Sequence, residues 1–250
     1  MNQQGVFKNQ YSKYYNLFYA EKNYELEVNY INSTIKKWSP SASKVLEFGS
    51  GTGGHGLLLQ KYGYEIFGVE LSAEMAGIAA KKGYNCRVGN MIDVSIDDTF
   101  DVVIALFHVI SYVNSNEELL KLLKNARKHL RPGGIFLFDV WFTPAVIHQM
   151  PEVRVKKAED EEIEITRLAQ PVLHHLKNVV DVNYHIFAKS KKDGNYVEFS
   201  EKHSMRHFGV PEVDLLAFNS GFTLLKAEEF LTGNEPSINT WGVNFILKAI

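Results

Sequence analysis

Residues 45–53 read VLEFGSGTG, and this run constrains the fold more than any other segment of the chain. An apolar stretch ends beside an acidic residue and is followed by glycines at alternate positions, Gly49, Gly51 and Gly53. Glycine allows the backbone to turn sharply and lets a ligand approach bare peptide groups. The pattern is typical of a strand–turn–helix unit that binds a ligand at a helix N-terminus in an α/β sheet.

Two acidic residues near this turn indicate which ligand it serves. Glu47 stands two positions before Gly49, where a carboxylate would repel a pyrophosphate and attract an ammonium group. Glu70 ends the next apolar run, 17 residues after Gly53, and can accept hydrogen bonds from both hydroxyls of a ribose. A ligand with an amino acid end, a ribose and a sulfonium charge suits both carboxylates. We therefore infer that the cofactor is S-adenosyl-L-methionine.

A dinucleotide site is the main alternative, because Gly49, Gly51 and Gly54 also fit the pattern G-x-G-x-x-G. The segment Gly89-Asn90-Met91 favours S-adenosylmethionine, since an amide can read the edge of adenine and a thioether can pack on its face. A nicotinamide-dependent oxidoreductase is the second hypothesis, and a binding protein without activity is the third. The cofactor that binds would separate the two enzyme classes.

Apolar runs alternate with helical patterns between residues 44 and 141. The strand-like runs are 44–49, 65–71, 84–89, 100–107 and 135–141, and helical patterns cover 54–62 and 117–130. This alternation predicts a Rossmann-like, seven-stranded, mostly parallel α/β sheet, in which 222–230 and 241–248 supply the last two strands. A ligand of such a sheet binds at the carboxyl ends of its strands.

The pattern changes after Trp141. Strand-like runs lie around 163–168, 179–188 and 196–207, and Lys192-Asp193-Gly194-Asn195 reads as the turn between the last two. These runs predict an inserted antiparallel sheet. The expected organisation is an N-terminal helical lid (1–43), a cofactor-binding core (44–150 and 209–250) and an antiparallel β insertion (151–208). We expect the insertion to wall the acceptor site and to offer strand edges for a homodimer contact.

Composition narrows the classes of partner. The chain has 250 residues and a net charge of −2, and it shows no basic stripe, so no nucleic acid partner is expected. Its single cysteine, Cys86, excludes an internal disulfide, and its histidines lack ligand spacing, so no metal site is expected. No apolar run approaches a membrane span and no signal segment opens the chain. The expectation is a cytoplasmic protein without a membrane partner.

These motifs resemble those of the class I S-adenosylmethionine-dependent methyltransferases. The first motif is VLEFGSGTG, the second acidic residue lies in GVELS, the adenine segment is VGNMIDV, and LRPGG precedes the fifth strand. Together they cover about residues 44–141. The resemblance implies the class I fold and methyl transfer from S-adenosyl-L-methionine.

A narrower resemblance covers most of the chain. It is to the bacterial N-methyltransferases that dimethylate nucleotide-linked amino sugars, and it is carried by 14–17 (YYNL) with Lys22 and Tyr24, by 105–110 (ALFHVI), by Trp141, and by 201–203 (EKH) with Phe208. In that group these regions close over the cofactor and face the sugar. The resemblance implies methyl transfer to the amine of such a sugar by in-line displacement. Methylation of a different small molecule, on nitrogen or oxygen, is the alternative.

The cofactor residues follow from the motifs and the resemblance. Aromatic side chains of the lid would surround the sulfonium with their ring faces. The expected residues are Tyr15, Tyr24, Glu47, Gly49, Gly51, Gly53, Glu70, Leu71, Asn90, Met91 and Leu106.

The acceptor residues come from the lid, the fourth and fifth strands and the insertion. His108 directly follows the fourth strand and His203 lies in the insertion, and both are candidate catalytic bases for an acceptor that must lose a proton. Tyr14, Tyr112 and Trp141 are expected to contact the acceptor.

Overall fold

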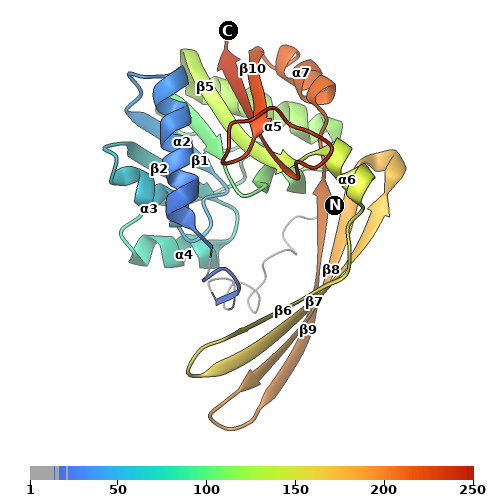
Figure 1. Ribbon diagram of the computed structural model, residues 1–250. Coiled ribbons are helices and arrows are strands. Elements are labelled where there is room, and N and C mark those ends of the chain that lie inside the picture. The colour runs from blue at the N-terminus through green and yellow to red at the C-terminus, as the bar shows by residue number, and fades with distance from the viewer. Residues whose placement is uncertain (1–13, 15–16, 21) are drawn as a thin grey trace.

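The computed structural model describes residue 14, residues 17–20 and residues 22–250. Seven strands form its main sheet: β1 (Lys44–Phe48), β2 (Glu65–Glu70), β3 (Cys86–Val88), β4 (Phe100–Ala105), β5 (Leu130–Trp141), β10 (Phe222–Glu229) and β11 (Gly242–Ala249). Their order is β10-β11-β5-β4-β1-β2-β3, and only β11 pairs antiparallel, with β5 and β10 (Figure 1). The predicted Rossmann-like, seven-stranded, mostly parallel sheet is therefore confirmed.

Helices cover both faces of this sheet. They are α2 (Tyr24–Trp38), α3 (Gly54–Gln60), α4 (Ala73–Lys81), α5 (Asn116–His129), α6 (Thr143–Gln149) and α7 (Val210–Phe218). The sequence explains α5 well, because the Ser115 hydroxyl accepts the Glu118 N–H as an N-cap and Leu119, Leu122 and Ala126 form one buried stripe. Among the described residues no helix is both long and apolar enough to cross a membrane.

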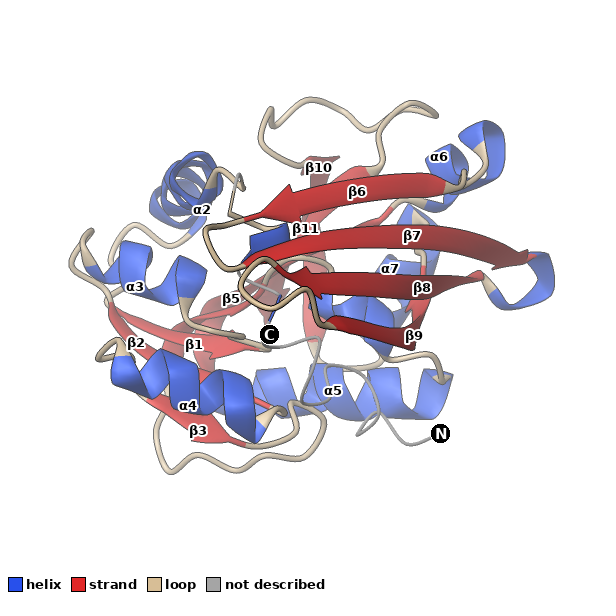
Figure 2. Cartoon of the chain, turned by 90° about the horizontal axis from the view of Figure 1, so that it is seen from below, coloured by secondary structure: helices blue, strands red, loops and turns tan. Residues whose placement is uncertain are grey.

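A second sheet of four antiparallel strands projects from the core (Figures 1 and 2). Its strands are β6 (Arg154–Glu159), β7 (Ile163–His174), β8 (Val179–Ser190) and β9 (Tyr196–Arg206). The predicted antiparallel insertion is thus confirmed, with β7, β8 and β9 at the three strand-like runs. The prediction missed β6, because its sequence RVKKAE is mostly charged and exposed and carries no apolar alternation.

The fifth strand is longer than predicted. The helix before it ends at His129, and β5 starts at Leu130, so Pro132-Gly133-Gly134 belongs to the strand rather than to a turn. Gly133 has a φ of 78°, and the β4–β5 register shifts between Phe100 and Val102. The strand therefore starts with an irregular segment.

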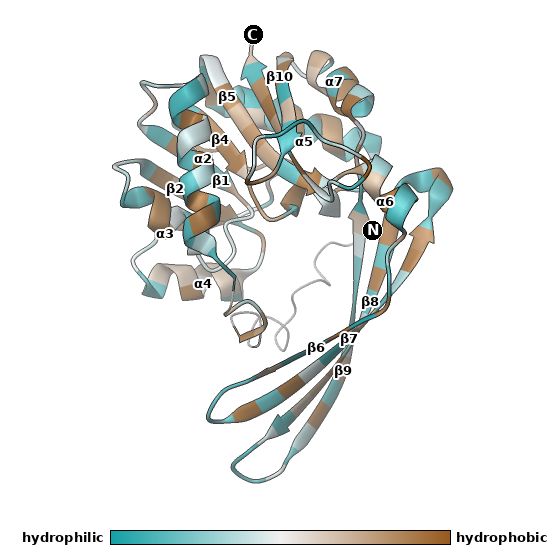
Figure 3. Ribbon diagram, viewed as in Figure 1, coloured by the Kyte–Doolittle hydropathy of each residue, from teal (hydrophilic) through white to brown (hydrophobic). Residues whose placement is uncertain are grey.

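The inner face of the insertion is apolar where the N-terminal segment meets it. Tyr14 and Phe18 pack with Ile165, Ile186 and Ala188 in one buried cluster. Figure 3 shows apolar and polar positions alternating along these strands, as expected for a sheet with one covered face. Much of the predicted lid, including Tyr15, lies outside the described residues.

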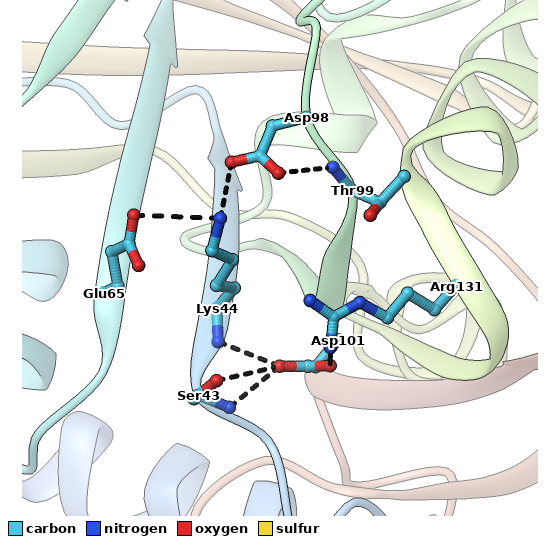
Figure 4. A network of polar contacts seen from close by, with 7 residues as sticks. All are labelled: Ser43, Lys44, Glu65, Asp98, Thr99, Asp101 and Arg131. Carbon is cyan, nitrogen blue, oxygen red and sulfur yellow. Dashed lines mark hydrogen bonds and ion pairs between the residues drawn. The ribbon is translucent and has the colours of Figure 1, made fainter.

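The amino ends of the strands are joined by a polar network (Figure 4). Asp101 accepts the backbone N–H groups of Ser43 and Lys44 at 2.9 Å each and pairs with Arg131 at 2.7 Å. Burial alone would raise the pKa of Asp101, but these donors and the guanidinium hold it below its ordinary value. This network stabilises the edge of the sheet opposite the cavity.

Candidate active site

A cavity of about 1630 Å³ lies beyond the carboxyl ends of the parallel strands and reaches the insertion. Its core side is lined by segments that follow β1 to β5, and its far side by residues of β8 and β9. A site for one small ligand usually occupies about 300–1,000 Å³. The cavity is therefore large enough for a cofactor and an acceptor together.

Most of the predicted site residues line this cavity. Those that do are Tyr24, Gly49, Gly51, Glu70, Leu71, Asn90, Met91, Leu106, His108, Tyr112, Trp141 and His203. Glu47, Gly53 and Tyr14 are described but are not part of the lining, and Tyr15 lies outside the described residues. The role of each residue stays a prediction.

The glycine turn opens directly onto the cavity. Gly49, Gly51 and Gly53 have φ values of 65°, 56° and 80°, a region that side chains disfavour. A Cβ atom on Gly51 would meet no atom within 4 Å, whereas one on Gly49 would lie 2.2 Å from Cγ2 of Val109. Gly49 is thus required by packing, and Gly51 leaves bare backbone facing the space where a ligand fits.

Glu70 spans the mouth of this turn. Its Oε2 accepts the Gly51 N–H at 2.8 Å, and its Oε1 accepts the Ser72 N–H at 2.8 Å. Burial raises the pKa of Glu70 despite these two donors. A carboxylate fixed in this way can accept bonds from the two hydroxyls of a ribose, so the turn and Glu70 fit the adenosyl half of S-adenosylmethionine.

Glu47 lies beneath the turn. It is 2% exposed, and its Oε2 accepts a hydrogen bond from the Tyr84 hydroxyl. Burial raises its pKa. A Cβ atom on Gly53 would lie 3.2 Å from the Tyr84 ring, so Tyr84 packs under the turn and holds Glu47 there. Sequence patterns do not reveal this partner, because 37 residues separate Tyr84 from Glu47.

The turn after β3 contains the two residues that are predicted to contact adenine. Asn90 uses its Oδ1 to accept the Ile92 N–H at 3.0 Å, which leaves its amide nitrogen as a donor toward the cavity lining. Met91 is 9% exposed and packs into the core with Val94. Both residues line the cavity, and their contact with adenine stays a prediction.

His108 is held by a buried carboxylate. Its Nδ1 lies 2.7 Å from Oδ2 of Asp139, which is 1% exposed. Asp139 also accepts the backbone N–H groups of Phe107 and His108 at 2.7 and 3.2 Å. Burial would raise the pKa of Asp139, but the imidazole and the Phe107 N–H hold it below its ordinary value.

The backbone at this point is strained. Phe107 and His108 have φ values of 64° and 60°, which costs a non-glycine residue about 1–2 kcal/mol each. Asp139 binds both N–H groups and so stabilises the strained turn. Strain of this kind concentrates at functional sites, and here it aims His108 at the cavity.

The insertion contributes a polar group on the opposite wall. The Tyr112 hydroxyl lies 2.8 Å from Nδ1 of His203, and Nε2 of His203 lies 3.1 Å from Oε2 of Glu201. Tyr184 contacts the His203 ring edge-on at 4.8 Å between centroids. Trp141 approaches His108 at 6.1 Å between ring centroids. The two predicted histidines therefore face one cavity from different elements.

An aromatic group stands between the turn and His108. Lys22 lies 4.0 Å from the Phe107 ring centroid and 5.0 Å from that of Tyr24, and it pairs with Glu27. A cation therefore lies beside Tyr24, one of the two rings that the prediction assigned to the sulfonium. The sequence reasoning missed Phe107, whose position becomes informative only once the left-handed turn after β4 is known.

Comparisons with known proteins agree with this geometry. The family model for the methyltransferase domain matches residues 45–134. The chain is 31% identical over 134 residues, 52% of this chain and 56% of the relative, to the dTDP-3-amino-3,4,6-trideoxy-alpha-D-glucopyranose N,N-dimethyltransferase of Streptomyces venezuelae.

Solved structures share the whole fold. The crystal structure of Streptomyces venezuelae DesVI has a TM-score of 0.81 at 22% identity, covering 98% of this chain and 100% of that one. CalS10, an amino pentose methyltransferase from Micromonospora echinaspora solved with bound SAM, has a TM-score of 0.76 at 20% identity and full coverage of both chains. The oxidoreductase hypothesis finds no support. The chain carries a methyltransferase domain over residues 45–134 and has the fold of solved S-adenosylmethionine-dependent methyltransferases.

Proposed function

We propose that the enzyme transfers a methyl group from S-adenosylmethionine to the amine of a nucleotide-linked amino sugar. One observation carries the proposal: a single cavity joins the glycine turn and Glu70 to a polar and aromatic wall that holds His108, Trp141 and His203. Its volume exceeds what the cofactor alone needs. The acceptor half therefore suits a polar molecule larger than a free amino acid.

Different residues would bind different parts of the cofactor. The Gly51 backbone, Glu70 and Asn90 would hold the adenosyl half, and Glu47 would attract the ammonium end. When bound, S-adenosylmethionine supplies an electrophilic methyl group for in-line displacement. The protein then has to align the acceptor at near-contact distance and exclude water, which Tyr24 and Trp141 can do from the lining.

An amine suits this site better than a hydroxyl. A neutral amine attacks with an existing lone pair, so the walls need only orient it and remove a proton. His108 with Asp139, or His203 with Glu201, offers a carboxylate-supported imidazole for that purpose. The named activity of the Streptomyces venezuelae relative is N,N-dimethylation of a dTDP-linked amino sugar, which supports the same class of acceptor.

The test is a turnover assay read by mass spectrometry. The enzyme is incubated with S-adenosylmethionine and matched pairs of nucleotide-linked sugars that differ only in an amino or a hydroxyl group. We expect the amino sugar to gain one or two methyl groups and its hydroxyl partner none. Turnover of a free amino acid or another small acceptor, with none of any sugar, would overturn the sugar proposal and leave the methyltransferase class intact.

We further propose that the enzyme acts in the cytoplasm as a homodimer. The free Cys86 suits a reducing compartment. The edge strand β6 exposes its backbone and 61% of Val155, which suits pairing with a second copy. Light scattering should give a dimer for the native chain and a monomer for Val155→Lys. A native chain that stays monomeric at all concentrations would overturn the homodimer proposal.

A further inference from the structure

Three side chains on the insertion side of the cavity form a continuous hydrogen-bonded chain. Tyr112 belongs to the short 3-10 helix η2 (Val109–Tyr112), and His203 and Glu201 lie two residues apart on β9. Alternate residues of a strand share one face, so Glu201 and His203 both point inward. The two distances, 2.8 Å to Tyr112 and 3.1 Å to Glu201, connect opposite nitrogens of one imidazole.

The carboxylate of Glu201 and the hydroxyl of Tyr112 determine which atoms donate in these two hydrogen bonds. An ionised carboxylate only accepts hydrogen bonds, so Glu201 requires a proton on Nε2 of His203. A neutral imidazole then carries a lone pair on Nδ1, and Tyr112 donates its O–H to that nitrogen. A phenol oxygen can accept a hydrogen bond as well as donate one, and Tyr112 lines the cavity.

Exposure separates the roles of the three residues. His203 is 2% exposed and the Glu201 side chain 8%, whereas Tyr112 is half-buried at the cavity. Tyr112 is therefore the most exposed member of this hydrogen-bonded chain, and both Tyr112 and His203 line the cavity. Tyr184 packs against the imidazole edge, and Arg167 lies 4.5 Å from the Tyr184 ring. Tyr184 and Glu201 thus contact His203 from the insertion, and Arg167 contacts Tyr184.

We propose that Tyr112, His203 and Glu201 form a proton relay that converts an incoming acceptor ammonium into the neutral amine. This inference rests on the proposed amine acceptor. The ammonium N–H proton passes to the Tyr112 oxygen as the Tyr112 O–H proton passes to Nδ1 of His203. The products are a neutral amine and an imidazolium, and Glu201 stabilises that charge. Tyr112 touches the acceptor, and His203 and Glu201 are positioning residues that act through it.

His108 has a different place in this scheme. Its Nδ1 faces Asp139, and the same carboxylate binds the strained backbone at Phe107 and His108. The Asp139–His108 pair is therefore fixed by the core and shapes the wall beside Trp141. The relay formed by Tyr112 of η2 and His203 and Glu201 of β9 is the path along which a proton can leave the acceptor.

The kinetic test compares Tyr112→Phe and Glu201→Gln with Glu198→Gln, an exposed acid on the same strand. At neutral pH the relay variants should lose roughly tenfold in kcat/KM, less than a lost obligatory base, because solution delivers some neutral amine. The loss should shrink as pH rises toward 9, where solution deprotonates the amine. A structural defect would persist at every pH. S-adenosylhomocysteine affinity and the Glu198→Gln rate should match the native enzyme.

A second measurement does not depend on turnover. Nitrogen-15 spectra of histidine-labelled enzyme, assigned with His203→Gln, should show His203 protonated at Nε2 in the native chain. Glu201→Gln should weaken that preference. A native His203 protonated at Nδ1, or relay variants with native rates at all pH values, would overturn the relay. Absence of any amine turnover with the Nε2 tautomer intact would instead refute the proposed acceptor.

Discussion

We call the side of the cavity that holds Gly51 and Glu70 the cofactor wall, and the side that holds Tyr112 and His203 the acceptor wall. The residues that meet on these two walls are separated by very different distances in the sequence. On the cofactor wall, Gly51 and Glu70 meet across 19 residues within the segment that matches the methyltransferase domain. On the acceptor wall, Tyr112 and His203 meet across 91 residues, from the 3-10 helix η2 and from strand β9 of the insertion. Local turn chemistry builds the first wall, whereas docking of the insertion builds the second. Mutations should therefore separate cofactor binding from acceptor turnover.

Gly51→Val should have the largest effect on the cofactor wall. An added side chain meets no protein atom, so the protein folds with a strain of about 1–2 kcal/mol while the valine occupies ligand space. Calorimetry should detect no S-adenosylhomocysteine binding. Gly63→Val is the matched control, because Gly63 also has a positive φ and open surroundings but lies outside the cavity. Native affinity in Gly51→Val would show that the turn does not face the cofactor.

Glu47→Gln should weaken binding of the amino acid end alone. Loss of a charged hydrogen-bond partner costs about 1.5–3 kcal/mol, so S-adenosylhomocysteine should bind roughly ten- to a hundredfold more weakly. Methylthioadenosine, which lacks that end, should bind as it does to the native chain. Equal losses for both ligands would contradict the assignment of Glu47 to the ammonium group.

The same substitution should stabilise the protein at neutral pH. Burial raises the folded-state pKa of Glu47, so the ionised carboxylate costs stability as pH rises above its unfolded value of about 4.3. Glutamine removes this cost and still accepts the Tyr84 hydroxyl. Thermal unfolding without ligand should show that Glu47→Gln raises the Tm above that of the native chain, and that this difference is larger at pH 7 than at pH 4.

His108→Asn tests the acceptor wall from the core side. For an amine acceptor, kcat should fall about tenfold or less, whereas a hydroxyl acceptor would lose on the order of 10²-fold with its base. His148→Asn, an exposed histidine on α6, serves as the control. A large loss with the amino sugar would mean that His108, rather than the Tyr112 relay, takes the proton.

Asp181→Asn should give the smallest effect, which we expect on stability. Burial would raise the pKa of Asp181, but donors from Lys202, Ser204 and His174 lower it to about 2. Because the unfolded value is about 3.9, this stabilisation is complete above that pH and lost as pH falls toward 2. Urea unfolding at pH 7 should show a loss of about 1 kcal/mol that vanishes near pH 2. A difference independent of pH would contradict the ionic origin.

The sequence predicted the main sheet because buried parallel strands read as continuous apolar runs and the turns between them hold glycines. It predicted that Gly49, Gly51 and Glu70 line one cavity, because the glycines and the acidic residue stand at fixed spacing in the sequence. It missed β6, whose exposed charged residues pair only through the backbone. It included Glu201 in the EKH segment but gave it no role of its own, because its contact with His203 forms only on the folded strand.

The most direct test of the two-wall account is the dissociation constant of S-adenosylhomocysteine for Glu70→Ala and Tyr112→Phe, measured side by side by calorimetry. Glu70→Ala should lose about 1–3 kcal/mol of affinity, since two hydroxyl bonds to a charged acceptor disappear. Tyr112→Phe should bind S-adenosylhomocysteine with the native constant, because its phenol serves the acceptor. Equal losses in both variants, or a loss in Tyr112→Phe alone, would contradict the division of the cavity into a cofactor wall and an acceptor wall.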